Sequence, residues 1–187
     1  MKILLTSTSF QDTPGPHHEL LNSQGFTIDV LRGPLKEDVL LPIIANYDAV
    51  ICGDDEYTED VLYKGIQGKL KYISKYGVGL DKINLVAAKK MGIPVTNCPG
   101  VNQISVAEHV LALLFTFEKS IHLQHETTKQ GNWSRITGNE IQGQTIGIIG
   151  LGSVGKELAK KSLALGMKVI GFDLFKNEKF IKTQPEI

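Results

Sequence analysis

Residues 146–155 read Ile-Gly-Ile-Ile-Gly-Leu-Gly-Ser-Val-Gly, so that three spaced glycines follow a short apolar run. A second apolar run, residues 167–173, ends in Asp173. The spacing G-x-G-x-x-G between a strand and a helix, with an acid at the end of the next strand, is typical of a turn that cradles a dinucleotide. The sequence therefore predicts a strand–turn–helix–strand unit with a dinucleotide site.

Five residues of the glycine turn (residues 150–155) have expected tasks. Gly150 permits the tight bend, Gly152 lets the backbone approach a pyrophosphate, and Gly155 lets the helix pack closely on the strand. The helix begins near Ser153 and Val154, where unpaired N–H groups and the positive end of the helix dipole favour a phosphate. We expect these five residues to bind the cofactor.

Asp173 predicts which dinucleotide is bound. A carboxylate at this position accepts hydrogen bonds from the ribose 2′-OH and repels a 2′-phosphate. No arginine follows it in the sequence. The expected cofactor is therefore NAD rather than NADP.

The composition is that of an ordinary globular protein. Of the 187 residues, 42% are hydrophobic and 21% are charged, and Lys+Arg and Asp+Glu both count 20. The absence of a basic excess argues against a nucleic-acid partner, and no apolar run has the length of a membrane span. The N-terminal apolar run is too short for a signal peptide, so we expect a cytoplasmic protein. Cys52 and Cys98 fit no metal spacing and are expected to be reduced, buried thiols, and no metal site is predicted.

Strands and helices alternate through the first hundred residues. Short apolar runs predict strands at 2–6, 26–31, 49–52, 72–76 and 94–97. Helical patterns lie between them at 16–23, 37–46, 58–63 and 83–91. Alternation of this kind predicts a parallel sheet with right-handed crossovers. We therefore expect an α/β protein whose residues 1–100 form a flavodoxin-like domain, with ligands at the carboxyl ends of its strands.

A different pattern begins near residue 100. Apolar residues recur at helical spacing from Ala107 to Ile121, which predicts one long amphipathic helix. Residues 127–143 are polar and predict a loop whose single large apolar anchor is Trp133. Residues 101–187 are thus expected to comprise this helix and the first part of a Rossmann dinucleotide-binding domain, which remains incomplete because such a fold needs about six strands.

Several motifs together resemble those of the D-isomer-specific 2-hydroxyacid dehydrogenase family, and most of all its phosphoglycerate-dehydrogenase-like branch. They are Ile-Ser-Lys-Tyr-Gly-Val-Gly-Leu-Asp at 73–81, Gly-Ile-Pro-Val-Thr-Asn-Cys-Pro-Gly at 92–100, Ser-Val-Ala-Glu-His at 105–109, Gly-Asn-Trp at 131–133 and the run that begins at Gly143. All occur in the order that the family shows. Ser153 is a departure, because the family often has a basic residue there.

The resemblance implies a substrate site in the first domain. Backbone amides at Val78 and Gly79 would bind the substrate carboxylate, with the alternative that the glycines of this segment only turn the chain. Lys75 would pair with a substrate carboxylate or phosphate, with a solvated surface lysine as the alternative. Asn102, at the crossover between the domains, would make a polar contact near the substrate.

The resemblance also implies a reaction and an assembly. The reaction is hydride transfer between NAD and a D-2-hydroxy acid, with a 3-phosphoglycerate-like compound favoured. The family's catalytic arginine, glutamate and histidine lie beyond residue 187, so no catalytic residue is assigned and the 187 residues alone are expected to be inactive. Residues 104–135 would mediate a homodimer.

Two other interpretations stay open. One is a non-catalytic dinucleotide-binding or interaction protein on the same scaffold. The other is a flavodoxin-like regulatory module in which the glycine turn is incidental.

Overall fold

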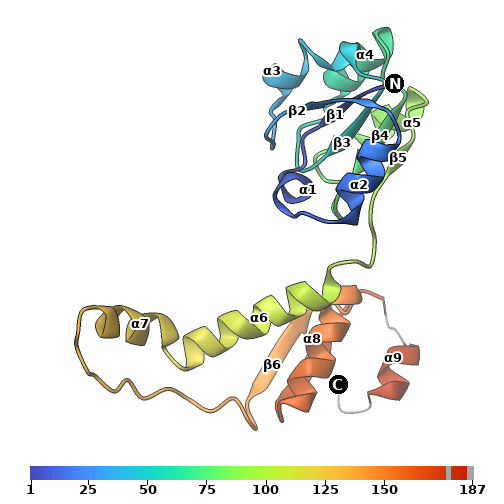
Figure 1. The fold of residues 1–187 in the computed structure, drawn as a ribbon. Helices are drawn as coiled ribbons and strands as arrows, with labels where there is room; N and C mark the ends of the chain where they lie inside the picture. Colours follow the sequence, from blue (N-terminus) through green and yellow to red (C-terminus); the bar gives the residue numbers. More distant parts are fainter. Residues whose placement is uncertain (176–177, 185–187) are drawn as a thin grey trace. The chain divides into compact units, whose positions relative to one another are not determined.

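A computed structural model describes residues 1–175 and 178–184, and residues 176–177 and 185–187 of the second expected domain lie outside this description. The chain divides into two compact units, Met1–Pro99 and Gly100–Ile187. The first unit contains β1 (Lys2–Leu5), α1 (Thr8–Asp12), α2 (Pro16–Ser23), β2 (Thr27–Val30), α3 (Glu37–Leu40), η1 (Ile44–Asn46), β3 (Ala49–Cys52), α4 (Glu59–Gln67), β4 (Tyr72–Lys75), α5 (Leu85–Lys90) and β5 (Val95–Thr96) (Figure 1).

The five strands of the first unit form one parallel sheet in the order β2-β1-β3-β4-β5. This order is that of flavodoxin-like folds, and the α/β class expected from the sequence is confirmed. Because all strands run the same way, their carboxyl ends gather at one edge of the sheet. The segments that follow β1, β3 and β4 therefore lie along that edge.

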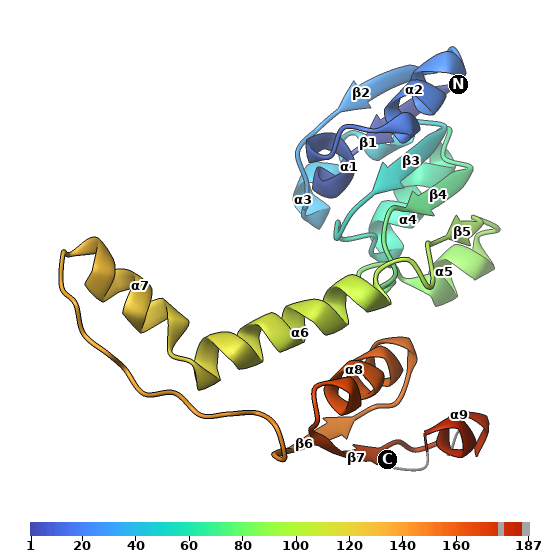
Figure 2. The ribbon, with the colours of Figure 1, turned by 60° about the horizontal axis from the view of Figure 1, so that its bottom comes forward.

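Local signals position the helices on the faces of this sheet. The Thr58 side chain accepts a hydrogen bond from the Val61 N–H at 3.3 Å and caps the start of α4. Asn84 caps α5 in the same way through Ala87 at 3.0 Å. The two helices pack on one face of the sheet in a core with the alternate strand residues Leu4, Val50, Cys52 and Ile73. Helices α1 and α2 lie on the other face (Figure 2).

Asp55 ties three segments together where β3 ends. Its buried carboxylate accepts hydrogen bonds from the Thr6 hydroxyl at 2.5 Å, the Leu35 N–H at 2.6 Å and the Gly53 N–H at 3.1 Å. Replacement of Asp55 by alanine would leave these donors without their acceptor, so we expect the first unit to lose about 2–4 kcal/mol of unfolding free energy. Urea denaturation measures this loss. The exposed Asp60→Ala is the control, and an equal loss in both variants would contradict the account.

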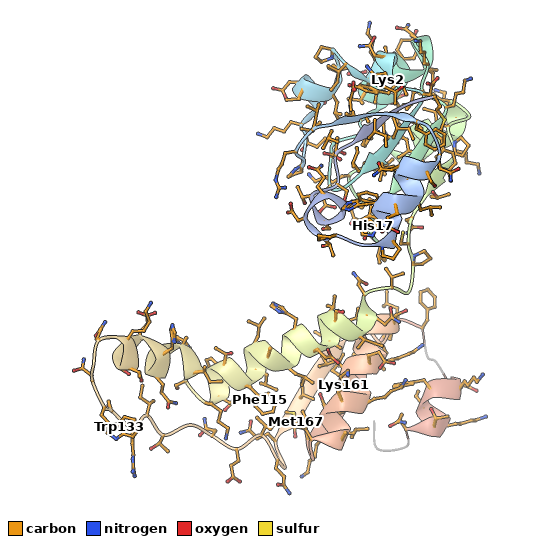
Figure 3. All side chains as sticks on the ribbon, viewed as in Figure 1. Lys2, His17, Phe115, Trp133, Lys161 and Met167 are labelled. Atoms are coloured by element: carbon orange, nitrogen blue, oxygen red, sulfur yellow. The ribbon has the colours of Figure 1, made fainter. Side chains whose placement is uncertain are left out.

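The second unit contains α6 (Gln103–Glu118), α7 (Ile121–Lys129), β6 (Thr145–Ile149), α8 (Ser153–Ala164), β7 (Lys168–Phe172) and α9 (Glu178–Thr183). Strands β6 and β7 pair in parallel, and α6 packs against α8. Lys161 of α8 joins Glu108 of α6 by an ion pair of 2.8 Å, and Figure 3 shows Lys161 between the two helices. No described helix is long and apolar enough to cross a membrane.

Two of the expected helices are interrupted. The predicted helix at 37–46 is wrong as a single element, because a turn separates α3 from η1 around Pro42, which has no N–H to donate to a continuing helix. The predicted long helix ends at Glu118, and Ser120 has a φ of 51° before α7 begins. The Asn139 N–H donates to the Glu118 carbonyl at 2.8 Å, so the returning chain satisfies the end of α6.

Trp133 is not the anchor of the segment after α7. Its side chain is 87% exposed, and Figure 3 shows it out on the long segment that leads back to β6. The buried side chain of that segment is Ile141. The predicted loop also begins later than residue 127, because α7 continues to Lys129.

Helices α1 and α9 were not predicted.

Candidate functional site

The glycine turn that connects β6 to α8 is tightly packed. Gly150 has a φ of 95°, which a side-chain-bearing residue rarely adopts, and its N–H donates to the Phe172 carbonyl of β7 at 2.7 Å. A Cβ placed on Gly155 would lie 2.0 Å from the Gly150 carbonyl oxygen. The close approach of helix and turn therefore requires glycine at Gly155.

The start of α8 is open on the side that a phosphate would approach. Gly152 is the residue before the first turn of α8, and a Cβ built on it would meet no described atom within 4 Å. Ser153, the first helical residue, is exposed, and Val154 is half-buried. The N–H groups of this first turn have no partner within the helix. The turn thus combines a tight backbone with a free face, as a pyrophosphate site requires.

Asp173 lies against the same turn. Its carboxylate accepts hydrogen bonds from the Leu151 N–H at 2.6 Å and from the Phe175 N–H at 2.9 Å. These backbone hydrogen bonds, that of Phe175 first, hold the pKa of Asp173 below its ordinary value. The carboxylate is therefore ionised at neutral pH. Its remaining lone pairs can accept from ribose hydroxyls.

The expected substrate residues of the first unit follow β4. We call residues 76–79 the β4 loop. The Cys98 N–H donates to the Gly77 carbonyl at 2.8 Å, and the Asn97 side chain donates to the Val78 carbonyl at 2.7 Å. These bonds hold the loop from its carbonyl side. Within the described residues, the N–H groups of Val78 and Gly79 donate no hydrogen bond, so they remain available to an anion.

Lys75 differs from a solvated surface lysine, because it is only 5% exposed. Its amine donates to the Gly53 carbonyl at 2.6 Å and forms an ion pair with Asp54. Asp54 was not predicted, although its place two residues after β3 signals the ligand edge of a parallel sheet. Asn102, by contrast, is an exposed residue at the start of α6 in the second unit, and its side chain does not cap that helix.

Aromatic side chains also reach the β4 loop. The Tyr76 ring contacts Phe10 of α1 edge-on, with centroids 5.2 Å apart, and lies 6.0 Å from the His17 ring of α2. His18 forms a hydrogen bond of 2.7 Å with the Phe10 carbonyl. The first two helices therefore buttress one side of the loop, a contact that the sequence did not predict.

Neither cysteine thiol, that of Cys52 or that of Cys98, belongs to a candidate site among the described residues. Burial raises the pKa of the Cys52 thiol to about 12, so this group stays protonated. Cys98 is half-buried and also remains a free thiol. No group of three or more His, Cys, Asp or Glu side chains in residues 1–175 and 178–184 is arranged to hold a metal ion.

Comparison with known proteins identifies relatives of this chain. The family model described as D-isomer specific 2-hydroxyacid dehydrogenase, catalytic domain, matches residues 4–178. The hydroxypyruvate reductase of Thermotoga maritima is 37% identical over 81% of this chain and 50% of its own length. The D-3-phosphoglycerate dehydrogenase of Methanocaldococcus jannaschii is 35% identical over 92% of this chain and 32% of its own.

A solved structure extends the likeness to the fold. The D-lactate dehydrogenase of Aquifex aeolicus, solved with NAD and lactic acid, is 30% identical and superposes with a TM-score of 0.78. The match covers 96% of this chain and 54% of the other. The chain thus spans half or less of the two relatives above and about half of this structure. It belongs to the D-isomer specific 2-hydroxyacid dehydrogenase family.

Proposed function

We propose that the protein to which this chain belongs transfers a hydride between NAD and a D-2-hydroxy acid. The observation that carries the proposal is the ionised Asp173 carboxylate bound to the N–H of Leu151 in the glycine turn. NAD, when bound, supplies the hydride acceptor. The turn at Gly150–Gly155 would hold its pyrophosphate, and Asp173 its adenosine ribose.

NAD is proposed over NADP because the acid beside the turn is charged. A 2′-phosphate would add negative charge close to Asp173, whose pKa is already lowered. The Aquifex aeolicus relative was solved with NAD, whereas an acyclic imino acid reductase of equal identity was solved with NADPH, so the choice rests on Asp173. A fluorescence titration with NADH and NADPH tests it, and tighter binding of NADPH would refute it.

The substrate is proposed to bind at the β4 loop. The unpaired N–H groups of Val78 and Gly79 would receive its carboxylate, with Lys75 beside them in its ion pair with Asp54. The resemblance implies a further polar contact near the substrate from Asn102. The name of the Methanocaldococcus jannaschii relative contains a phosphorylated substrate, 3-phosphoglycerate, and that of the Thermotoga maritima relative an unphosphorylated one, hydroxypyruvate. Reduction of hydroxypyruvate gives the D-2-hydroxy acid D-glycerate, so a small D-2-hydroxy acid agrees with both names, and the resemblance favours a 3-phosphoglycerate-like one. A cytoplasmic location stays a prediction from the sequence.

The 187 residues alone are expected to bind NADH without turning over substrate. The resemblance assigns the arginine, glutamate and histidine of the reaction to positions outside these residues, and loss of an acid/base group alone costs about 10²–10⁴ in rate. The measurement is NADH formation by the purified chain with D-lactate, D-glycerate and 3-phosphoglycerate. Steady turnover, absent from a mock purification, would contradict the proposal.

A homodimer is proposed through α6, α7 and the segment after them. Apolar side chains on this arm are exposed, among them Leu113, Phe117 and Trp133. Figure 2 shows α7 and the following segment extending away from α8 within the second unit. A patch of this kind is typical of an interface between protein chains.

Phe117→Asp is expected to convert this dimer into a monomer, because a charge cannot be buried there without a partner. Val86→Asp, at an exposed valine of α5, is the matched control and should leave the dimer intact. Light scattering of the three proteins at equal concentration measures the change. A wild-type chain that is monomeric at all concentrations would refute the interface.

The alternative is a dinucleotide-binding protein without catalysis on the same scaffold. Such a protein would bind NADH, as the proposed enzyme would. It becomes the leading account if the protein isolated from its source cells binds NADH but oxidises no 2-hydroxy acid.

A further inference from the structure

We propose that Asp54 sets the charge of the anion accepted at the β4 loop, so that singly charged 2-hydroxy acids are favoured over phosphorylated ones, in contrast to the 3-phosphoglycerate-like substrate that the resemblance favours. The inference rests on the proposed substrate role of this loop and narrows its substrate class. It follows from the ion pair between Asp54 and Lys75, from the position of that pair beside the loop, and from the charges around it.

Lys75 is the residue that would attract a phosphate, and its amine lies under the loop. A Cβ built on Gly77 would lie 3.1 Å from Cε and 4.0 Å from Nζ of Lys75. The side chain therefore runs beneath the first glycine of the loop instead of reaching into solvent. The register Cys52↔Lys75 between β3 and β4 places it beside the Gly53–Asp54 segment.

Asp54 covers this amine from the solvent side. The Asp54 side chain is 81% exposed, whereas that of Lys75 is 6% exposed. An anion that approaches the amine from solvent therefore meets the carboxylate first. An ammonium group has three N–H donors, and two of them are used by Gly53 and Asp54. The formal charge of the pair is zero, so it offers little attraction to an added phosphate.

The other charges near the loop lead to the same preference. An oxygen of Asp81 lies 3.2 Å from a Cβ built on Gly79, which places a second carboxylate at the far end of the loop. Arg32, the only arginine of the first unit, is paired with Asp12. The free N–H groups of Val78 and Gly79 suffice for one carboxylate. A phosphate would add roughly two negative charges between Asp54 and Asp81.

D-glycerate and 3-phosphoglycerate form a matched pair of probes, because they differ only in the phosphate. Their dissociation constants can be measured from NMR shifts of the Val78 and Gly79 amides in the whole chain. We expect the wild-type chain to bind D-glycerate at least as tightly as 3-phosphoglycerate. Asp54→Asn should strengthen 3-phosphoglycerate binding about tenfold and D-glycerate binding about threefold or less, since the freed Lys75 charge acts on more ligand charge.

Three controls make the result specific. Asp54→Glu keeps the carboxylate and should keep the wild-type preference, and Asp60→Asn removes an exposed charge of α4 and should change neither ligand. In a Lys75→Met chain, Asp54→Asn should give a clearly smaller gain, because no ammonium group is freed. Equal gains for both ligands, or equal gains with and without Lys75, would overturn the inference.

The same samples separate this inference from the proposed function. NADH fluorescence reports binding at the glycine turn of the second unit. A chain that binds NADH while neither acid shifts the Val78 and Gly79 amides would refute the substrate role of the loop, and the inference with it. A chain that fails to bind NADH but shows the charge selectivity would support the inference and count against the proposed cofactor site.

Discussion

Gly155→Ala is expected to abolish dinucleotide binding and to destabilise the second unit. The added methyl group would lie 2.0 Å from the Gly150 carbonyl oxygen, so either the turn or the first turn of α8 must move. Displacement of a packed backbone costs about 1–3 kcal/mol. Helix propensity alone predicts the opposite sign, because alanine is favoured over glycine inside a helix by about 1 kcal/mol. The measurements are NADH titration and thermal unfolding.

Two other glycines serve as controls for this result. Gly147 lies in β6, and a Cβ there would meet nothing within 4 Å, so Gly147→Ala should leave both measurements nearly unchanged. Gly152→Ala should spare stability but weaken NADH binding, since its open side faces the proposed pyrophosphate position. If Gly155→Ala binds NADH as well as Gly147→Ala does, the turn is not the binding site.

Asp173→Ala is expected to remove the preference for NADH over NADPH. The variant loses the acceptor for the ribose 2′-OH and the charge that repels a 2′-phosphate, which together should change the ratio of dissociation constants by about 10–100-fold. Because the pKa of Asp173 is lowered, its charge is lost only as the pH falls through that low value. Between about pH 5 and 8 the charge of Asp173 should therefore be constant, so the preference should change there only with the second ionisation of the NADPH 2′-phosphate, near about pH 6.

Asp173→Asn distinguishes the charge from the shape of this residue. Its side-chain carbonyl can still accept from the Leu151 N–H, so the turn keeps one of its supports. We expect NADPH binding to improve in this variant while NADH binding falls less than in Asp173→Ala. Unchanged discrimination in both variants, measured by competitive titration, would show that another residue selects the cofactor.

Features that depend on neighbouring residues could be predicted from the sequence. The glycine turn is such a feature, because its glycines, its strand and its helix are contiguous and its acid ends the next strand. The parallel sheet of the first unit could also be predicted, since strands and helices alternate visibly. Pro42 was an available signal that the helix at 37–46 would break, because proline lacks the N–H that a helix interior needs.

Features that depend on strand order or burial could not be predicted in this way. Lys75 meets Asp54 only because β3 and β4 are neighbours in register, so no local pattern around Lys75 indicated that its charge is paired. The size of Trp133 alone predicts an anchor, although burial is set by what the rest of the fold places beside it. The end of α6 likewise depends on Asn139, which returns from a distant part of the chain.

The central claim is that this chain binds NAD at the turn between β6 and α8. The most direct test is a two-dimensional NMR titration of the isotope-labelled chain with NAD. We expect saturable shifts of the backbone amides from Leu151 to Gly155 and of Asp173. An absence of shifts at saturating NAD, or shifts confined to residues 1–99, would contradict the claim.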